Sequence, residues 1–307
     1  MTVATASPLL SRPGAVPGRG VDEPVAGHYG DPLREQRTAL AGDAVVDRSH
    51  RGVVRVDGPD RLSWLHSLTS QHLTSLPAGE WIEALVLSPH GHVEHHLALV
   101  DDGASTWIHV EPGTAPALVA YLDSMRFMLR VEVADVSTSY AVLSRIGEST
   151  VVDEIVPRDA LVATVEDWGL PLVGHEAFEA LRVAAGRPRL GFETDHRTIP
   201  HEVGWIGVAV HLDKGCYRGQ ETVARVQNLG RPPRRLVLLH LDGTQETLPA
   251  PGEPVTLDER PVGFLGTAVQ HAQLGPVALA VVKRQTPDDA QLLVAAMAAK
   301  PERLVNA

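Results

Sequence analysis

Short apolar stretches, broken by glycine and proline, recur along most of the chain. Residues 81–87, 92–100 and 106–110 have the composition of strands, and Gly91 and Asp102-Gly103 supply the turns between them.

Helical patterns alternate with these strands. Leu62, Leu65 and Leu68 recur at the spacing of one helix face, and residues 116–126 and 176–185 have the pattern of two further helices. Strands and helices mixed in this way predict an α+β fold, in which helices cover one face of each sheet.

The pattern changes after Arg231-Pro232-Pro233. Short strands with Gly and Pro between them follow at 235–241, 254–257, 262–270 and 277–282. Such closely spaced strands are typical of a small C-terminal β-barrel.

Four segments follow from these patterns. Residues 1–27 are rich in Pro, Gly, Ala and Ser, so we expect a disordered tail there. An N-terminal α+β region is expected at 28–139, a second α+β region at 140–232, and the barrel at 233–307.

Composition narrows the function classes. The 307 residues are 44% hydrophobic, enough for packed cores, and the net charge of -11 favours neither nucleic acid nor anionic membrane as partner. The single cysteine, Cys216, excludes an intramolecular disulfide and a cysteine-based zinc site. No apolar run has the length of a membrane span, and the N-terminal residues lack the pattern of a secretory signal. We therefore expect a cytoplasmic protein, and a monomer, since no dimer stripe is evident.

The segment Lys214-Gly-Cys-Tyr-Arg-Gly-Gln-Glu221 carries the strongest chemical signal. Its two glycines, Gly215 and Gly219, permit left-handed backbone and close approach of a ligand. The helix expected to begin at Gln220 places Cys216 just ahead of a helix N-terminus and beside cations, which favours thiolate. Taken without further context, a lone cysteine is equally explained as a small buried hydrophobe.

This segment resembles the K-G-C-[FYW]-x-G-Q-E signature of YgfZ-type folate-binding proteins. Arg51–Pro59 and Leu65–Thr69 resemble the N-terminal region shared with the glycine-cleavage T-protein, and Leu181–Gly191 resembles the family's L-R-x-x-x-G-x-P-x-x-G stretch. The resemblance covers residues 30 to 285 and is strongest between 181 and 235.

The resemblance implies a T-protein-like multi-domain fold around a central folate site, with tetrahydrofolate as cofactor. It implies an accessory role in iron–sulfur cluster assembly or repair, a link to tRNA modification, and iron–sulfur proteins or their assembly machinery as partners. Cys216 would be the catalytic residue. The cofactor-binding residues would be Lys214, Gly215, Tyr217, Arg218, Gly219, Gln220, Glu221, Arg182 and Trp205.

One departure from the T-protein bears on the reaction. The T-protein has a G-G-x-x-D-D-L stretch, whereas residues 91–97 place His95 and His96 where its aspartates stand. A neutral imidazole cannot supply the negative charge that aminomethyl transfer needs. If the alignment shifts by one residue, Glu94 compensates. A tetrahydrofolate-dependent aminomethyltransferase or demethylase therefore remains the alternative, and the sequence leaves open whether the protein is an enzyme.

Other functions have weaker support. A thiol enzyme independent of folate needs a general base, for which His201 and His211 are available. If residues 90–96 form a strand, one face presents four potential metal ligands, His90, His92, Glu94 and His96, but a half-solvated polar strand explains them equally, and we assign no metal ligand.

Cations gather around the same segment. We consider that some of them hold the glutamate tail of folate, because guanidinium groups bind carboxylates well. A solvated face explains them as well, and without an interleaved aromatic platform we expect no nucleic acid partner. The set comprises Lys214, Arg218, Arg225, Arg231, Arg234 and Arg235.

Overall fold

The computed structural model describes residues 5–148, 151–244 and 247–304, which divide into two compact units. The first unit comprises the described residues up to Val86, then His95–Phe178 and Asp213–Tyr217. The second comprises Leu87–Glu94, Glu179–Leu212 and the described residues from Arg218 onward. The units interleave along the chain, so the boundary expected between residues 139 and 140 stays a prediction.

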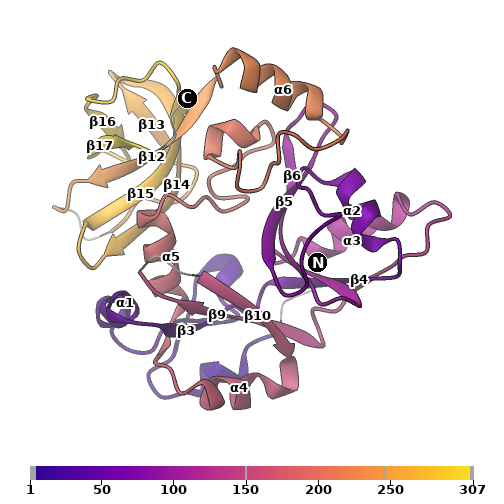
Figure 1. Cartoon of the computed structure of the whole chain (residues 1–307). Helices are drawn as coiled ribbons and strands as arrows, with labels where there is room; N and C mark the ends of the chain where they lie inside the picture. Colours follow the sequence, from indigo (N-terminus) through magenta and orange to yellow (C-terminus); the bar gives the residue numbers. More distant parts are fainter. Residues whose placement is uncertain (1–4, 149–150, 245–246, 305–307) are drawn as a thin grey trace. The chain divides into compact units, whose positions relative to one another are not determined.

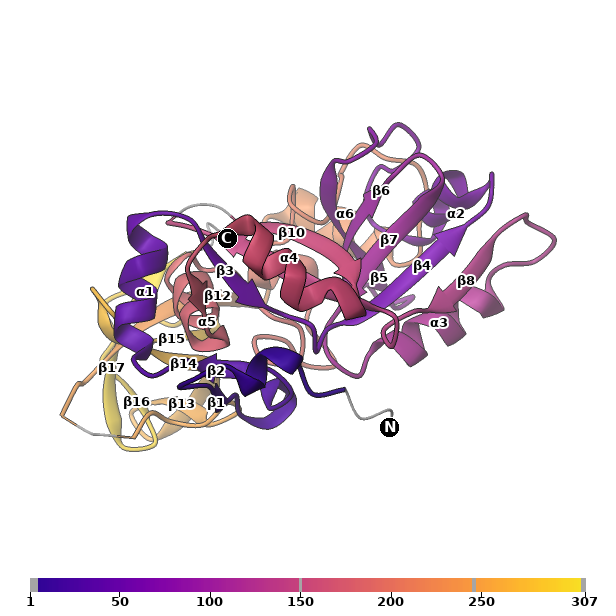
Figure 2. The ribbon, with the colours of Figure 1, turned by 90° about the horizontal axis from the view of Figure 1, so that it is seen from below.

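A five-stranded sheet forms one half of the first unit, in the order β5-β6-β7-β4-β8. Figure 2 shows β6, β7 and β4 side by side. Alternate residues of these strands, such as Leu97 and Leu99, point into a core that is closed by helix α2 (Arg61–Leu68) and helix α3 (Ala115–Ser124). The strands are β4 (Gly52–Asp57), β5 (Trp81–Leu87), β6 (Val93–Asp101), β7 (Ser105–Val110) and β8 (Glu132–Asp135).

A four-stranded sheet, in the order β10-β9-β3-β11, forms the other half of this unit. Helix α4 (Leu161–Trp168) packs its apolar residues Leu161 and Val165 against the sheet (Figure 1). Helix α1 (Pro32–Ala41) contacts strand β11, and helix α5 (His175–Ala184) follows β11 in the chain. The strands are β3 (Ala44–Asp47), β9 (Tyr140–Ile146), β10 (Val151–Pro157) and β11 (Leu172–Val173), with the short helix η3 (Arg158–Ala160) after β10.

Residues 5–27 differ from the disordered tail expected from their composition, while residues 1–4 lie outside the described part. Leu9, Val25 and Ala26 are buried, and the Ser7 hydroxyl donates to Asp47 on β3. Proline and glycine here form tight turns instead of a flexible chain. The elements are η1 (Pro8–Ser11), β1 (Val16–Pro17), η2 (Gly20–Asp22) and β2 (Ala26–His28).

The second unit contains a closed barrel in the order β12-β15-β14-β13-β16-β17. Its interior is filled by aliphatic side chains such as Leu239, Leu265 and Ala280. The predicted α+β fold with a C-terminal β-barrel is thus confirmed. The barrel strands are β12 (Arg234–Leu241), β13 (Pro254–Leu257), β14 (Arg260–His271), β15 (Gly275–Lys283), β16 (Leu292–Val294) and β17 (Met297–Arg303).

Two helices of the second unit precede the barrel, η4 (Pro200–Val203) and α6 (Gln220–Leu229). Helix α6 begins at Gln220, where the sequence predicted a helix start. Within residues 5–148, 151–244 and 247–304, no helix combines the length and the apolar character needed to cross a bilayer.

Candidate functional site

The segment Lys214–Glu221 passes from the first unit into the second, and each half is held within its own unit. Lys214 is only 5% exposed, although lysine is almost never buried without partners. Its ammonium group donates to the carbonyl oxygens of His66 and Thr69, at the C-terminal end of α2. The negative end of the helix dipole favours a cation at this place. Lys214 therefore anchors the loop on α2.

Tyr217 is the second anchor of this half. It is 9% exposed, and the Lys214 ammonium lies 4.8 Å from the centre of its ring, a cation–π contact. Burial lowers the pKa of Lys214 to about 8 and raises the pKa of Tyr217 to about 12. The tyrosine is consequently neutral at pH 7, and most of the lysine is charged.

Gly215 and Cys216 lie between these two buried residues, and both are exposed. A Cβ atom added at Gly215 would meet no protein atom within 4 Å, and the residue does not have a positive φ. Neither backbone strain nor protein packing therefore requires glycine there. The loop presents an accessible thiol beside open space.

Gly219 is fixed by protein backbone instead. It has a φ of +82° as the N-cap of α6, and an added Cβ would lie 2.6 Å from the Ser88 oxygen and 2.9 Å from the Gly91 Cα. Gly91, with a φ of +78°, is equally close to Thr222 on α6. The turn before β6 therefore packs closely on Gly219, and a ligand contact there stays a prediction.

The polar residues of this second half lie at the start of α6. Arg218 pairs with Glu94, with Nη1 3.2 Å from Oε2, and both side chains are about one-third exposed. Gln220 is half-buried, and Glu221 is exposed in the first helical turn, where a carboxylate interacts favourably with the helix dipole. Folate contacts by these residues stay predictions.

Arg182, a predicted folate ligand, is buried among protein partners in the second unit. It donates to both carboxylate oxygens of Glu179, at 3.0 and 2.7 Å, and to Glu193 at 3.0 Å. It also donates to the Thr267 hydroxyl and the Arg187 carbonyl oxygen. Burial alone would lower the pKa of Arg182, but the two carboxylates raise it. The structure thus gives Arg182 a role in holding α5 to the barrel.

Trp205, the other predicted folate ligand outside the motif, is buried in the second unit after η4. Its backbone carbonyl accepts hydrogen bonds from the amides of Ala209 and Val210. The structure accounts for it as core, and a pterin contact stays a prediction.

The arginines near the motif separate into two groups. Arg234 binds Asp195 and Glu202, and Arg235 is buried against Thr286 and Asp288. Arg225 and Arg231 are instead exposed. A carboxylate ligand from solution would therefore meet Arg225 and Arg231, because protein carboxylates already engage the other two.

The chain is similar to several known proteins. It matches no protein-family model. It is 27% identical to a putative chloroplastic transferase of Arabidopsis thaliana over 73% of this chain and 61% of that protein. It is 27% identical to the mitochondrial iron–sulfur cluster assembly factor IBA57 homologue of Mycosarcoma maydis over 64% of this chain and 57% of that protein. It is 30% identical to the tRNA-modifying protein YgfZ of Colwellia psychrerythraea over 47% of this chain and 41% of that protein.

A solved structure extends the similarity to the whole fold. The crystal structure of the glycine cleavage system aminomethyltransferase T from Bartonella henselae superposes with a TM-score of 0.83, at 17% identity, over 97% of this chain and 95% of that one. The chain has the T-protein fold and is similar in sequence to YgfZ-type proteins. It nevertheless spans less than two thirds of the length of each of the three relatives named above.

His95 and His96 leave β6 on opposite faces. His96 Nε2 lies 2.6 Å from Glu83 Oε2. His95 is half-buried on the face of Leu97, and burial lowers its pKa, so the ring is neutral at pH 7. Neither histidine supplies the free carboxylate of the T-protein stretch, and Glu94 is paired with Arg218.

The sequence alone does not mark two side-chain clusters that the first unit contains. In one, His109 lies 2.8 Å from Asp153, whose other oxygen binds Arg48 at 2.9 Å. Burial lowers the pKa of His109 to about 4, so a neutral imidazole bridges this network to Arg51. His109 lies on β7, Asp153 on β10, and both arginines in the link between β3 and β4, so no local motif marks the cluster. The second cluster, Asp22, His50 and His175, is treated below.

Further expectations from the sequence stay predictions. His201 and His211 belong to the second unit and Cys216 to the first, so a base for a folate-independent thiol enzyme stays a prediction. The cytoplasmic location and the monomeric state do so too.

Proposed function

We propose that this protein binds a reduced folate and assists the assembly or repair of iron–sulfur clusters, with Cys216 as its reactive thiol. The observation that carries the proposal is the pair of buried anchors, Lys214 and Tyr217, around the exposed Gly215-Cys216. A thiol on an anchored loop reacts without first paying the entropy of ordering that loop. The relatives named as a cluster assembly factor and a tRNA-modifying protein support this class of function.

The residues present fit a folate. The open space at Gly215 and the exposed thiol of Cys216 are accessible to a ligand. In the second unit, the exposed Arg225 and Arg231 suit a carboxylate, because guanidinium groups bind carboxylates in a bidentate manner. Bound folate would supply a carrier for a one-carbon unit. The protein's part is to hold the tail and to keep the Cys216 thiol accessible.

A tetrahydrofolate-dependent aminomethyltransferase or demethylase is the alternative, and the T-protein fold is its support. His95 and His96 weigh against it. A neutral, half-buried imidazole and an imidazole paired with Glu83 do not replace two carboxylates that stabilise developing positive charge.

The first experiment is an anaerobic calorimetric titration with tetrahydrofolate of wild type, Cys216→Ser and Gly215→Ala. We expect micromolar binding by wild type and Cys216→Ser, and binding at least tenfold weaker by Gly215→Ala, because the new methyl group occupies the open space. Arg225→Ala and Arg231→Ala should weaken binding of a polyglutamylated folate, whereas Lys300→Ala on the barrel serves as a charge-matched control. Absence of folate binding by folded wild type would overturn the folate part of the proposal.

The second experiment addresses the thiol. In a host lacking its own copy, wild type should restore the activity of an iron–sulfur enzyme, and Cys216→Ser should not, at equal protein level and equal folate affinity. If Cys216→Ser restores that activity fully, the thiol is not the reactive group. Turnover of an aminomethyl or methylamine donor by wild type would favour the alternative instead.

A further inference from the structure

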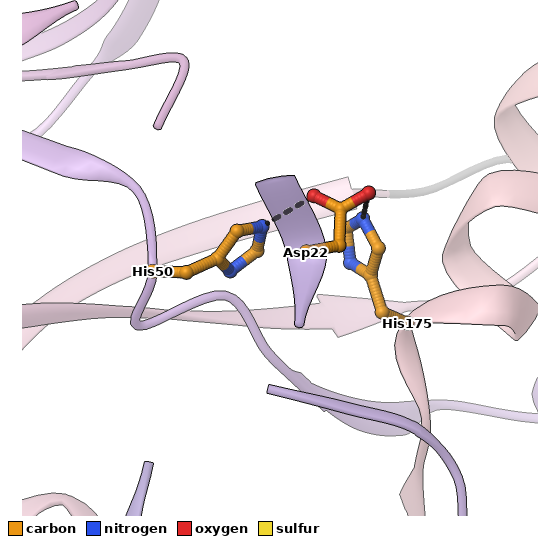
Figure 3. A group of neighbouring side chains, drawn as sticks. All are labelled: Asp22, His50 and His175. Carbon is orange, nitrogen blue, oxygen red and sulfur yellow. Dashed lines mark hydrogen bonds and ion pairs between the residues drawn. The ribbon is translucent and has the colours of Figure 1, made fainter. Parts of the chain in front are cut away.

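Three potential metal ligands meet within the first unit, away from the Lys214–Glu221 segment in the sequence. Asp22 ends helix η2, His50 lies in the link between β3 and β4, and His175 is the first residue of α5. Figure 3 shows both imidazole rings directed at the one carboxylate. Each residue offers one ligand atom, and these three atoms all lie within 4.8 Å of one another.

The separations between the ligand atoms leave space for one ion between the carboxylate and both imidazoles. His50 Nε2 lies 2.9 Å from Asp22 Oδ1, which a hydrogen bond explains. His175 Nε2 lies 3.6 Å from Asp22 Oδ2, which is too long for one. Ligands about 2.1 Å from a tetrahedral ion lie roughly 3.4 Å from one another, close to both separations. A shared ion therefore accounts for both imidazoles at once.

The surroundings favour a defined site over a surface cluster. Asp22, His50 and His175 are 9%, 2% and 4% exposed. The two imidazole rings meet edge to face, at 83° and 5.0 Å between centres, and Phe178 stacks on His175. The guanidinium of Arg48 lies 4.2 Å from the centre of the Phe178 ring and binds Asp153. Packing thus restricts the rotation of both rings before any ion arrives.

We propose that Asp22, His50 and His175 bind one divalent transition-metal ion. Two imidazoles and one carboxylate are a donor set suited to Zn²⁺ or Fe²⁺, whereas Mg²⁺ and Ca²⁺ prefer oxygen ligands. Three protein ligands leave a coordination position for water. The ion would join η2 of the N-terminal segment to the β3–β4 link and to the start of α5. This site is independent of the folate proposal.

The test uses full-length protein without a histidine tag, stripped with chelator and titrated with Zn²⁺ and Co²⁺. Wild type should take up one equivalent, give the visible absorption of Co²⁺ bound to nitrogen and oxygen, and gain about 5 °C in unfolding midpoint with excess metal. Zn²⁺ should also slow proteolytic release of the N-terminal segment, since the ion links η2 to the sheet.

Matched variants separate this site from other ligands. Asp22→Asn and His175→Gln keep side-chain size and should lose the metal-dependent shift, while His90→Ala/His92→Ala and Cys216→Ser should keep it. Circular dichroism checks that each variant is folded. Titration with tetrahydrofolate measures folate binding separately from metal binding. The proposal is overturned if folded wild type takes up well below one equivalent, or if Asp22→Asn and His175→Gln keep full uptake. Loss of metal uptake only in His90→Ala/His92→Ala would assign the metal to the turn before β6 and would also overturn the proposal.

Discussion

In the first half of the Lys214–Glu221 segment, buried side chains hold the loop, whereas in the second half backbone packing holds the start of α6. Lys214 and Tyr217 fix the first half and leave Gly215 and Cys216 exposed. In the second half, Gly219 packs directly on Ser88 and Gly91. Two glycines four residues apart in one motif thus have different physical roles, and the accessible chemistry lies in the first half.

The largest effect should come from Gly219→Ala. The alanine would have a left-handed backbone conformation, and its Cβ would lie 2.6 Å from the Ser88 oxygen, so α6 or the turn must shift. We expect a loss of about 2 to 4 kcal/mol in the free energy of unfolding, measured by urea denaturation. Gly215→Ala is the control and should change it by less than about 0.5 kcal/mol. Equal losses in the two variants would contradict the distinction between the halves.

Lys214→Met should have the next largest effect. The carbonyl groups of His66 and Thr69 lose a buried donor, which costs about 1 to 3 kcal/mol. Lys283→Met, at an exposed lysine on the barrel, is the control. Unfolding of Lys214→Met at the wild-type urea midpoint would show that the ammonium is not an anchor.

The pH dependence of the same pair gives a second test. Burial lowers the pKa of Lys214 from its ordinary value of 10.5 to about 8 in the folded protein. Between these two values the unfolded chain binds the proton and the folded chain does not, so stability rises with pH. Wild type should therefore gain stability relative to Lys214→Met as the pH rises from 8 to 10.5. A constant or falling difference in urea midpoints over this range would contradict the lowered pKa.

Pairing across the second half should contribute less. Arg218 and Glu94 form a partly exposed ion pair, with 3.2 Å between the nearest atoms. A double-mutant cycle with Arg218→Ala and Glu94→Ala should give a coupling free energy of about 0.2 to 1 kcal/mol that decreases in high salt. A coupling above about 2 kcal/mol would make this pair an anchor comparable to Lys214.

Local patterns in the sequence predicted strands, helices and the C-terminal barrel, and they predicted that the Lys214–Glu221 segment leads into a helix. The composition of residues 81–87, 92–100 and 106–110 predicted strands, and glycine with proline predicted the turns of the barrel. What packs against a residue is a property of the fold, so the sequence did not predict that Gly219 lies against the turn at Ser88. The flexibility expected of residues 5–27 was wrong for the same reason: Ser7 binds Asp47, 40 residues away.

The residues that the sequence missed share a physical cause. Asp22 and His50 are 28 residues apart and His175 lies much further along the chain, so no spacing marks them as one cluster. The same holds for His109, 44 residues from Asp153. His50 lies in a link, His109 in a strand and His175 at the start of a helix, so no common local pattern connects them.

The smallest effect on stability should come from Cys216→Ser, and it should be the most informative about chemistry. The thiol is exposed between two buried anchors, so replacing sulfur with oxygen changes no packed contact. We expect the free energy of unfolding to change by less than about 0.5 kcal/mol. In native wild type, a maleimide should label the thiol stoichiometrically and nearly as fast as in urea, because the fold does not cover it. Slow labelling that speeds up in urea, together with a stability loss in Cys216→Ser, would mean that Cys216 is a packed residue and that the first half of the motif is as closed as the second.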